Sequence, residues 1–396
     1  MYLRRIEYKI KSSLWSFAKD SFYSHRVKDS PLIKNLNYTC NEEQDRALLC
    51  YFPTFFFKTI DKKTLGRTIP LEIFKVVKIL SELGYCIDII SINDLKAIEF
   101  VKSSSYSLIF GFGDTFYQMT RLQPGAMSIF YVTENHPEFS YREERKRLDY
   151  FYERHKRKAS IDRSGRFYKL EHVSVKYDQI IAMGELEYFS DQYETPYSLF
   201  PTGLLNKNFE NKPKDHLNGR KHFLWLGSPA VVHKGLDLLI DIARNRDDIT
   251  LHICGLSAKA RELLDMPRKS NIIDYGFINI NSEEFLKIAY TCSFSILPSC
   301  SEGMATSITT SMLQGLIPVV MRDAGFNRLG EHAIFLEDYR IDYINEMLTE
   351  LSETDPAELD VLAQKVFAFA SQNFTPAAYE KSMRSILKDI IKRRNI

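Results

Sequence analysis

The 396-residue sequence contains no stretch of about 20 consecutive apolar residues, so we expect no membrane-spanning helix. Its basic N-terminus also lacks the continuous apolar segment of a signal peptide. The formal net charge of +2 is too small to indicate a nucleic acid as the main partner. A hydrophobic content of 44% and a charged content of 26% are ordinary for a soluble globular protein. These features together predict a cytoplasmic protein.

The sequence is also poor in the patterns that bind metal ions. Its six cysteines form no C-x-x-C pair, and no group of cysteine and histidine has the spacing of a zinc site. Several cysteines fall inside apolar, strand-like runs, where reduced thiols pack as small hydrophobic groups. We therefore expect no zinc site of this kind and only reduced thiols, at Cys40, Cys50, Cys86, Cys254, Cys292 and Cys300.

The length of the chain allows two domains, each with its own core. Residues 47–57 and 86–92 read as buried strands, and apolar residues at helical spacing from Ile73 to Leu80 lie between them. This order predicts parallel strands. It recurs after a polar linker, with strands expected near residues 222–227, 249–255, 271–276, 293–299 and 316–321.

The predicted fold class is therefore α/β, with two Rossmann-like, doubly wound parallel-sheet domains. We expect the terminal helix to pack back on the first domain. The predicted divisions are residues 1–45 (basic extension), 46–205 (first domain), 206–220 (linker), 221–376 (second domain) and 377–396 (terminal helix).

Two segments are rich in charge. Residues 1–36 hold eight Lys/Arg and three Asp/Glu, which fits either a helix on an anionic membrane or an amphipathic helix packed on the first domain. The irregular apolar spacing favours the packed helix. Residues 141–176 hold twelve Lys/Arg and six Asp/Glu. Such a segment is typically a solvated helix face, and a surface that binds phosphate or lipid head groups is the alternative.

Two strand ends in the second domain carry residues suited to a diphosphate, since ligands of doubly wound sheets bind at the carboxyl ends of strands. Lys234 follows a strand that ends at Gly227, and Glu302–Gly303 stands where another strand turns into a helix. A lysine and free helical N–H groups there would attract phosphate, and a carboxylate would accept hydrogen bonds from sugar hydroxyls. The alternatives are an exposed Lys234 and a helix-capping Glu302, and we expect His233 to be a surface residue.

Two further strand ends, at Gly255 and at Gly276–Ile278, have the small and apolar residues expected beside a nucleotide base. A dinucleotide-binding enzyme is disfavoured. The Gly111-Phe112-Gly113 sequence has Phe116 where that fingerprint requires a third glycine.

The order and spacing of these motifs resemble the C-terminal half of family 4 glycosyltransferases. The matching motifs are G-S-x5-K-G-L-D-L-L-I from Gly227, Y-G-F from Tyr275, L-P-S-x-x-E-G from Leu297 and Q-G-L-I-P-V-V from Gln314. They cover roughly residues 221–330, and the N-terminal half is similar in pattern only. The resemblance implies the GT-B fold, in which two Rossmann-like domains face a cleft, and a donor bound mainly by the second domain without a metal ion.

By this resemblance, Lys234 holds the donor diphosphate and Glu302 contacts the donor sugar. His136, after a strand of the first domain, matches a histidine near the transferring sugar; its alternative is a polar loop residue. The other expected donor contacts are Gly66, Gly227, Ser228, Gly255, Ile278, Gly303, Met304, Ala305 and Thr310.

The sequence departs from the family pattern at two of these positions. Ser228 stands where the family usually has an arginine, and Thr310 stands where it repeats a glutamate. A threonine hydroxyl hydrogen-bonds a sugar without the strength of a charged acceptor. These replacements motivate a second hypothesis, a catalytically impaired GT-B protein that binds a sugar or regulates a partner.

The leading hypothesis is a metal-independent, retaining glycosyltransferase of the hexosyltransferase type. The resemblance implies a UDP- or GDP-sugar as donor and a glycan or lipid-linked acceptor, as in surface polysaccharide biosynthesis. The basic termini are compatible with peripheral contact at the inner membrane face.

Overall fold

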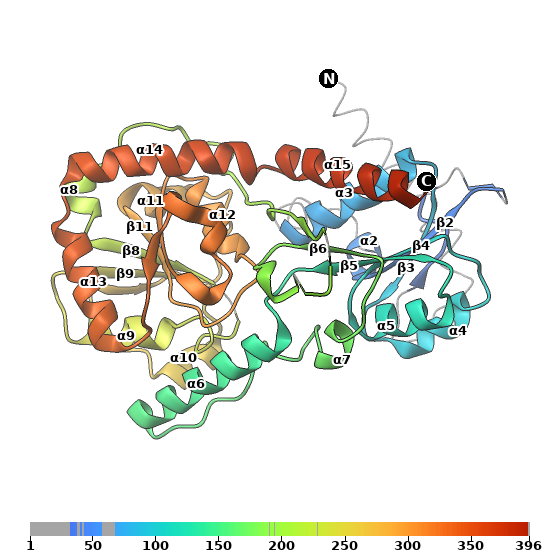
Figure 1. The fold of residues 1–396 in the computed structure, drawn as a ribbon. Coiled ribbons are helices and arrows are strands. Elements are labelled where there is room, and N and C mark those ends of the chain that lie inside the picture. Colours follow the sequence, from blue (N-terminus) through green and yellow to red (C-terminus); the bar gives the residue numbers. More distant parts are fainter. Residues whose placement is uncertain are drawn as a thin grey trace.

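A computed structural model describes residues 32–37, 40–41, 43–57, 68–189, 191–193, 195–227 and 229–394. Two of the residues expected at the site, Gly66 and Ser228, lie outside the described residues, as does most of the basic extension. The described chain forms two α/β lobes, each built on one sheet (Figure 1).

The first sheet has seven strands in the order β1-β3-β2-β4-β5-β6-β7. All neighbours pair in parallel except β1, which runs antiparallel along β3. The strands are β1 (Leu32–Ile33), β2 (Arg46–Tyr51), β3 (Cys86–Ser91), β4 (Leu108–Gly111), β5 (Met127–Val132), β6 (Gln179–Ala182) and β7 (Tyr197–Ser198). Its helices are α2 (Thr54–Phe57), α3 (Thr68–Glu82), α4 (Ile98–Val101), α5 (Gly113–Leu122), α6 (Pro137–His155) and α7 (Leu170–Val173).

The strand expected over residues 47–57 is shorter than its apolar run. It ends at Tyr51, and α2 follows at Thr54. Pro53 lies between them and has no N–H to continue a ladder, which explains the break.

The second sheet has six strands, all parallel, in the order β10-β9-β8-β11-β12-β13. They are β8 (His222–Leu226), β9 (Thr250–Cys254), β10 (Ile272–Asp274), β11 (Phe294–Leu297), β12 (Ile317–Met321) and β13 (Ile334–Leu336). Its helices are α8 (His216–Gly219), α9 (Leu236–Arg244), α10 (Ala258–Leu264), α11 (Glu283–Thr291), α12 (Thr306–Met312), α13 (Ile341–Glu353) and α14 (Pro356–Asn373). Two doubly wound parallel-sheet units confirm the predicted fold class.

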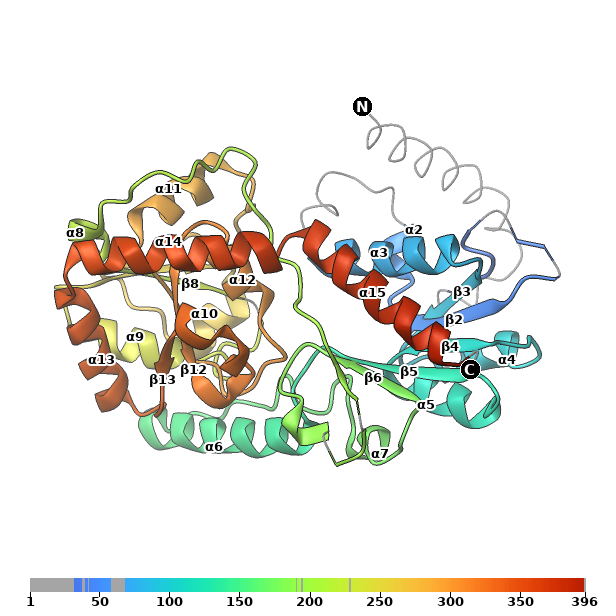
Figure 2. The same ribbon diagram turned by 45° about the horizontal axis from the view of Figure 1, so that its top comes forward.

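The last helix, α15 (Pro376–Arg394), crosses from the second lobe to the first and lies beside α3 (Figure 2). Met383 and Leu387 are fully buried in the core of the first lobe. Glu380 forms ion pairs with Lys75 and Lys78 of α3. Apolar burial and charge pairing therefore hold the chain end on the lobe where the described chain begins.

Helix α6 makes the opposite crossing. It follows β5 of the first sheet but runs along the second lobe (Figures 1 and 2). Phe151 is fully buried in the second core, and Arg154 pairs with Asp237 and Asp241. The expectation of a solvated helix face is therefore wrong for one side of α6, because that side is buried on the other domain.

The expectation of six reduced thiols is wrong for one pair. Cys40 and Cys86 form a disulfide, with Cα atoms 5.3 Å apart, and the other four cysteines are buried and free. The segment around β1 follows the edge of β3, since the Leu36 N–H donates to the Ile87 carbonyl and the Ile87 N–H donates to Asn37 Oδ1. This edge contact brings Cys40 to the start of β3. Among the helices of the described ranges, none is long and apolar enough to cross a membrane.

Candidate active site

Lys234 and Glu302 meet where β8 and β11 end. The Lys234 ammonium lies 2.5 Å from Glu302 Oε1, and the residues are 5% and 4% exposed. The residue after Lys234, Gly235, lets this loop pack against the end of β11. Its φ is +67°, and a Cβ there would lie 2.4 Å from the Pro298 carbonyl oxygen. The alternative that Lys234 is an exposed residue of the first helical turn is therefore wrong.

The surroundings of Glu302 keep it ionised. Ser299 donates its hydroxyl to Oε1 at 2.9 Å. Burial acts to raise the pKa of Glu302, but the charges of Lys234 and Arg163 outweigh burial and lower it to about 2. The capping alternative is also wrong, because α12 begins at Thr306 after Ala305 and has no side-chain cap. The carboxylate is thus a charged acceptor held next to a buried ammonium.

The loop after β11 presses directly on the first lobe. A Cβ on Gly303 would lie 2.2 Å from the Thr133 carbonyl oxygen, in the loop after β5. The neighbouring Met304 has a φ of +84°, a strained conformation for a residue with a side chain. Met304 and Ala305 are buried in the second core, so this segment can offer a ligand its backbone rather than its side chains. The ion pair therefore lies beside the junction of the two lobes.

His136 stands on the first-lobe side of this junction, at the residue before α6. It is half-buried, and its ring lies 5.6 Å from that of Phe189. Burial lowers the pKa of His136, so the imidazole is neutral at neutral pH. A neutral imidazole can donate or accept a hydrogen bond.

The glycines expected near a nucleotide occupy the carboxyl ends of the strands. The Gly227 N–H donates to the Cys254 carbonyl at 3.0 Å, and the Gly255 N–H donates to the Gly276 carbonyl at 2.6 Å. Gly255 has a φ of +103°. Ile278 is buried in a small apolar cluster beside them, whereas Phe277 is 82% exposed.

Thr310 faces the connection between the lobes. It is 3% exposed, and its hydroxyl accepts a hydrogen bond from the Leu204 N–H at 3.1 Å. The neighbouring Gly203 N–H donates to the Phe374 carbonyl at 2.7 Å. In the described structure the Thr310 hydroxyl therefore fixes the connecting segment.

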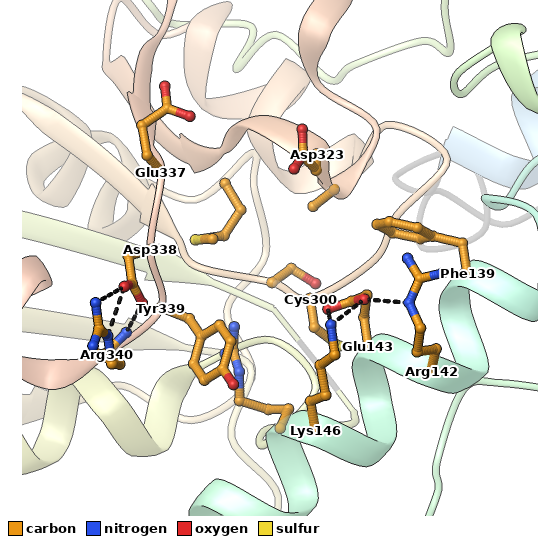
Figure 3. A pocket seen from close by; sticks show the side chains of 14 residues that line it. Phe139, Arg142, Glu143, Lys146, Cys300, Asp323, Glu337, Asp338, Tyr339 and Arg340 are labelled. Atoms are coloured by element: carbon orange, nitrogen blue, oxygen red, sulfur yellow. Dashed lines mark hydrogen bonds and ion pairs between the residues drawn. The ribbon is translucent and has the colours of Figure 1, made fainter.

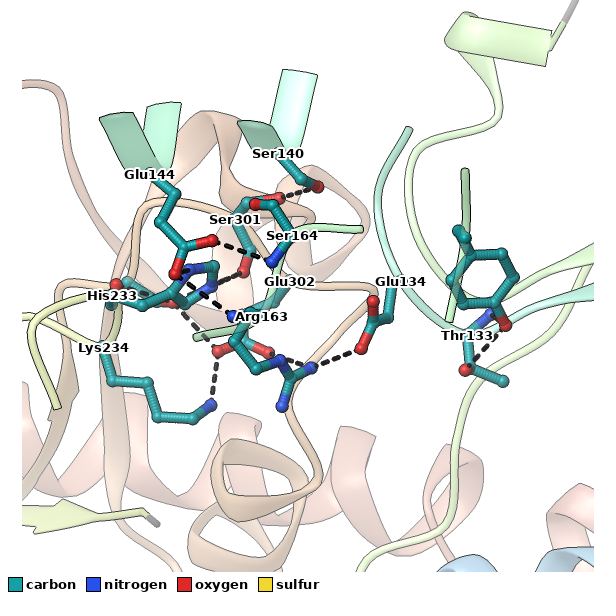
Figure 4. Close-up of polar contacts among 12 residues, drawn as sticks. Thr133, Glu134, Ser140, Glu144, Arg163, Ser164, His233, Lys234, Ser301 and Glu302 are labelled. Carbon is teal, nitrogen blue, oxygen red and sulfur yellow. Dashed lines mark hydrogen bonds and ion pairs between the residues drawn. The ribbon is translucent and has the colours of Figure 1, made fainter. Parts of the chain in front are cut away.

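Sequence reasoning missed a network of charged residues around the ion pair, shown in Figure 4. His233 is 3% exposed rather than on the surface, so that expectation is wrong. Its Nε2 lies 2.6 Å from the Ser301 carbonyl oxygen, and its Nδ1 lies 3.4 Å from Glu144 Oε1. Burial opposes a charged imidazole, but the Cys300 sulfur and the Glu144 carboxylate raise the pKa of His233 to about 10. His233 is therefore a buried cation next to Lys234.

Glu144 of α6 contacts His233 and also fixes the turn at residues 162–164. It accepts the backbone N–H groups of Asp162, Arg163 and Ser164 at 2.9, 3.2 and 2.8 Å. Burial raises the pKa of Glu144, but the bonds it accepts from His233 and these amides lower it to about 2. The turn presents Arg163, whose Nη2 lies 2.8 Å from Glu134 Oε1 and 3.8 Å from Glu302 Oε2. No motif links these residues in sequence, because they meet only when α6 lies on the second lobe.

A pocket of about 510 Å³ opens between α6 and the loops after β11, β12 and β13 (Figure 3). Ser299 and Cys300 line it, so the pocket shares a wall with the ion-pair site. Several of its charges are paired, as in Lys146 with Glu143 and Arg340 with Asp338. Its lining is thus polar and close to electrically balanced.

Comparison with known proteins bears on the fold. No protein-family model and no curated protein matches the sequence. Among solved structures, sucrose-phosphate synthase from Thermosynechococcus elongatus has a TM-score of 0.58 and 11% identity, covering 88% of this chain and 100% of that chain. HepE from Anabaena, in complex with UDP-glucose, has a TM-score of 0.55 and 14% identity, covering 87% of this chain and 99% of that chain. The chain therefore shares the two-domain GT-B fold of these proteins, as its sequence predicts.

Proposed function

We propose that the protein is a retaining glycosyltransferase that moves a hexosyl group from a nucleotide-diphosphate donor, without a metal ion, to a glycan or lipid-linked acceptor. One observation carries the proposal: a buried lysine–glutamate pair at the carboxyl edge of the second sheet, beside the junction with the first lobe. The shared fold supports it, and HepE of the same fold binds UDP-glucose.

In the proposed reaction, Lys234 exchanges its contact with Glu302 for the donor diphosphate. The exchange frees Glu302 Oε1, which then accepts a hydrogen bond from a hydroxyl of the donor sugar. As the bond from the anomeric carbon to the phosphate oxygen breaks, negative charge grows on the diphosphate, and the ammonium stabilises it without reorganisation. The acceptor oxygen bonds to the same face of the carbon, and its proton passes to the leaving phosphate. This route retains configuration without a protein nucleophile.

The proposed acceptor rests on the resemblance and on the charge of the last helix. The resemblance to family 4 enzymes favours a glycan or a lipid-linked glycan of surface polysaccharide biosynthesis, in the cytoplasm. The end of α15 is basic, with Lys392, Arg393 and Arg394 in its last turn, and would lie well on an anionic membrane surface.

Donor hydrolysis across UDP-, GDP- and ADP-sugars tests the proposal, with the first-formed anomer followed by proton NMR and with EDTA present and absent. We expect one sugar nucleotide to be hydrolysed, the released sugar to keep the donor's configuration, and EDTA to have no effect. Lys234→Met and Glu302→Gln should abolish hydrolysis, whereas Lys287→Met on the exposed face of α11 should not. Release of the inverted anomer, or full activity in Lys234→Met, would contradict the mechanism.

A catalytically impaired sugar-binding module is the second candidate. The Thr310 hydroxyl favours it, because that hydroxyl is already bonded to the Leu204 N–H. Calorimetry separates the two functions. Sugar-nucleotide binding without hydrolysis or transfer would identify a binding module.

A further inference from the structure

The carboxylate of Glu302 lies between two cations that come from different parts of the chain. Lys234, in the connection between β8 and α9, lies 2.5 Å from Oε1, and Arg163 lies 3.8 Å from Oε2. Arg163 belongs to the connection between α6 and α7, which follows a strand of the first sheet. Figure 4 shows both side chains directed toward Glu302. The first half of the chain thus places a guanidinium at a site built mainly by the second half.

The turn that carries Arg163 is fixed by buried contacts. Glu144, 1% exposed, accepts three consecutive backbone N–H groups of residues 162–164 and also faces His233. One buried carboxylate therefore sets the position of this turn and of the residue next to Lys234. A pre-positioned guanidinium loses less entropy when it binds an anion than a free surface arginine does.

Each carboxylate of the network has a basic partner before any ligand binds. Glu134 and Glu302 contact Arg163, Glu302 also contacts Lys234, and Glu144 contacts His233. A diphosphate brings negative charge to a site whose basic groups are already paired, so at least one of them must leave its carboxylate partner to receive it.

Arg163 is well placed to join Lys234 in that exchange. Its side chain is 24% exposed, against 7% for Lys234 and 2% for His233. The Nη2 of Arg163 donates to Glu134, and its buried Nε has no hydrogen-bond partner among the described residues. The flat guanidinium can therefore turn toward a phosphate and donate two parallel hydrogen bonds.

We propose that Arg163 binds the donor diphosphate opposite Lys234, leaving its contact with Glu134 when the donor enters. The inference rests on the proposed function for the identity of the ligand. It assigns a donor contact to the first half of the chain, next to the place where Gly303 meets Thr133.

Calorimetry with a ladder of ligands tests this role: a nucleoside, its monophosphate, its diphosphate and inorganic pyrophosphate, in the uridine and guanosine series. We expect Arg163→Gln to weaken diphosphate binding about 30-fold, or about 2 kcal/mol, and nucleoside binding less than about twofold. Arg163→Lys should recover part of the loss, because it restores charge without the fork. Arg166→Gln is the matched control, since its exposed guanidinium lies over Phe167 in the same segment.

The outcomes separate this inference from the proposed function. Equal losses for nucleoside and diphosphate would show that Arg163 only supports the fold of the site, and no loss for either would remove it from the site. Absence of nucleotide binding to the wild type would overturn the proposed function. If pyrophosphate still binds the wild type and is lost in Arg163→Gln, the anion-binding role stands alone. If neither ligand binds, both proposals fall.

Discussion

Lys234→Met removes the ammonium from a buried ion pair and keeps most of the aliphatic stem. Lys234 and Glu302 are 5% and 4% exposed, so bulk water cannot solvate the Glu302 carboxylate in place of the ammonium. Of its described neighbours, Ser299 at 2.9 Å and Arg163 at 3.8 Å remain beside it. Removing one partner of a buried ion pair costs about 3–5 kcal/mol. Because these two neighbours still stabilise the carboxylate, we expect the unfolding free energy to fall by about 3 kcal/mol.

Glu302→Gln and the double variant complete a mutant cycle. Glu302→Gln leaves the Lys234 ammonium buried without its carboxylate and should cost a similar amount. The double variant buries neither charge, so we expect it to lie within about 1 kcal/mol of the wild type. A double variant as unstable as the sum of the single ones would show that the two residues act independently and would refute the pairing.

The cost of Lys234→Met should depend on pH. In the wild type, burial raises the pKa of Glu302, but Lys234 and Arg163 lower it to about 2. A lowered carboxyl pKa adds stability that is present above the unfolded pKa and is lost as the pH falls through the folded pKa. Lys234→Met lacks most of this contribution, and its carboxylate takes up a proton at higher pH. The difference from the wild type should therefore be largest near pH 7 and shrink toward pH 4.

Trp225 gives a local signal for this measurement. It is one of two tryptophans in the sequence, is fully buried, and donates its indole N–H to the Lys234 carbonyl at 3.2 Å. In a Trp15→Phe background, urea unfolding followed by fluorescence reports the second lobe, which avoids treating a two-domain chain as one transition. A cost below about 1 kcal/mol, or one that does not change between pH 7 and 4, would refute the reasoning.

Three further substitutions test other features. Burial raises the pKa of Glu72 to about 8, so the folded protein binds a proton there that the unfolded chain loses at lower pH. The unfolding free energy of the wild type should therefore fall relative to that of Glu72→Gln as the pH rises from 5 toward 8, by up to about 1.4 kcal/mol per pH unit. Urea titrations that give both proteins the same dependence of unfolding free energy on pH would contradict this. Gly303→Ala forces a Cβ against the Thr133 carbonyl, so donor hydrolysis should fall more than about 100-fold while circular dichroism keeps its wild-type shape. Thr310→Val removes the acceptor of the Leu204 N–H, so the free energy of unfolding, measured by thermal unfolding, should fall by about 1–3 kcal/mol. A loss of donor affinity without a loss of stability would show that the hydroxyl contacts the ligand instead.

The sequence was sufficient to predict what depends on local order along the chain. Alternating strands and helices identify both sheets, since each parallel crossover is a local unit. Lys234 and Glu302 were predicted for one site because each lies in the connection after a strand of the second sheet. The structure brings them into contact because β8 and β11 pair in that sheet. The pairing of Cys40 with Cys86 was missed because it depends on β1 lying along β3, and two residues of strand give too weak a pattern to predict.

The charged network could not be predicted, because it depends on where α6 lies. The helical periodicity of residues 137–155 is compatible with packing on either domain. In the structure Phe151 fills the second core and Arg147 donates to the Pro298 carbonyl at the end of β11. Only this placement brings Glu144 over His233 and delivers Arg163 to Glu302. A boundary drawn at the linker assigns α6 to the first domain, although its buried side completes the second domain's site. The site is therefore a property of both halves of the chain, and substitutions in α6 should act on chemistry at the ends of β8 and β11.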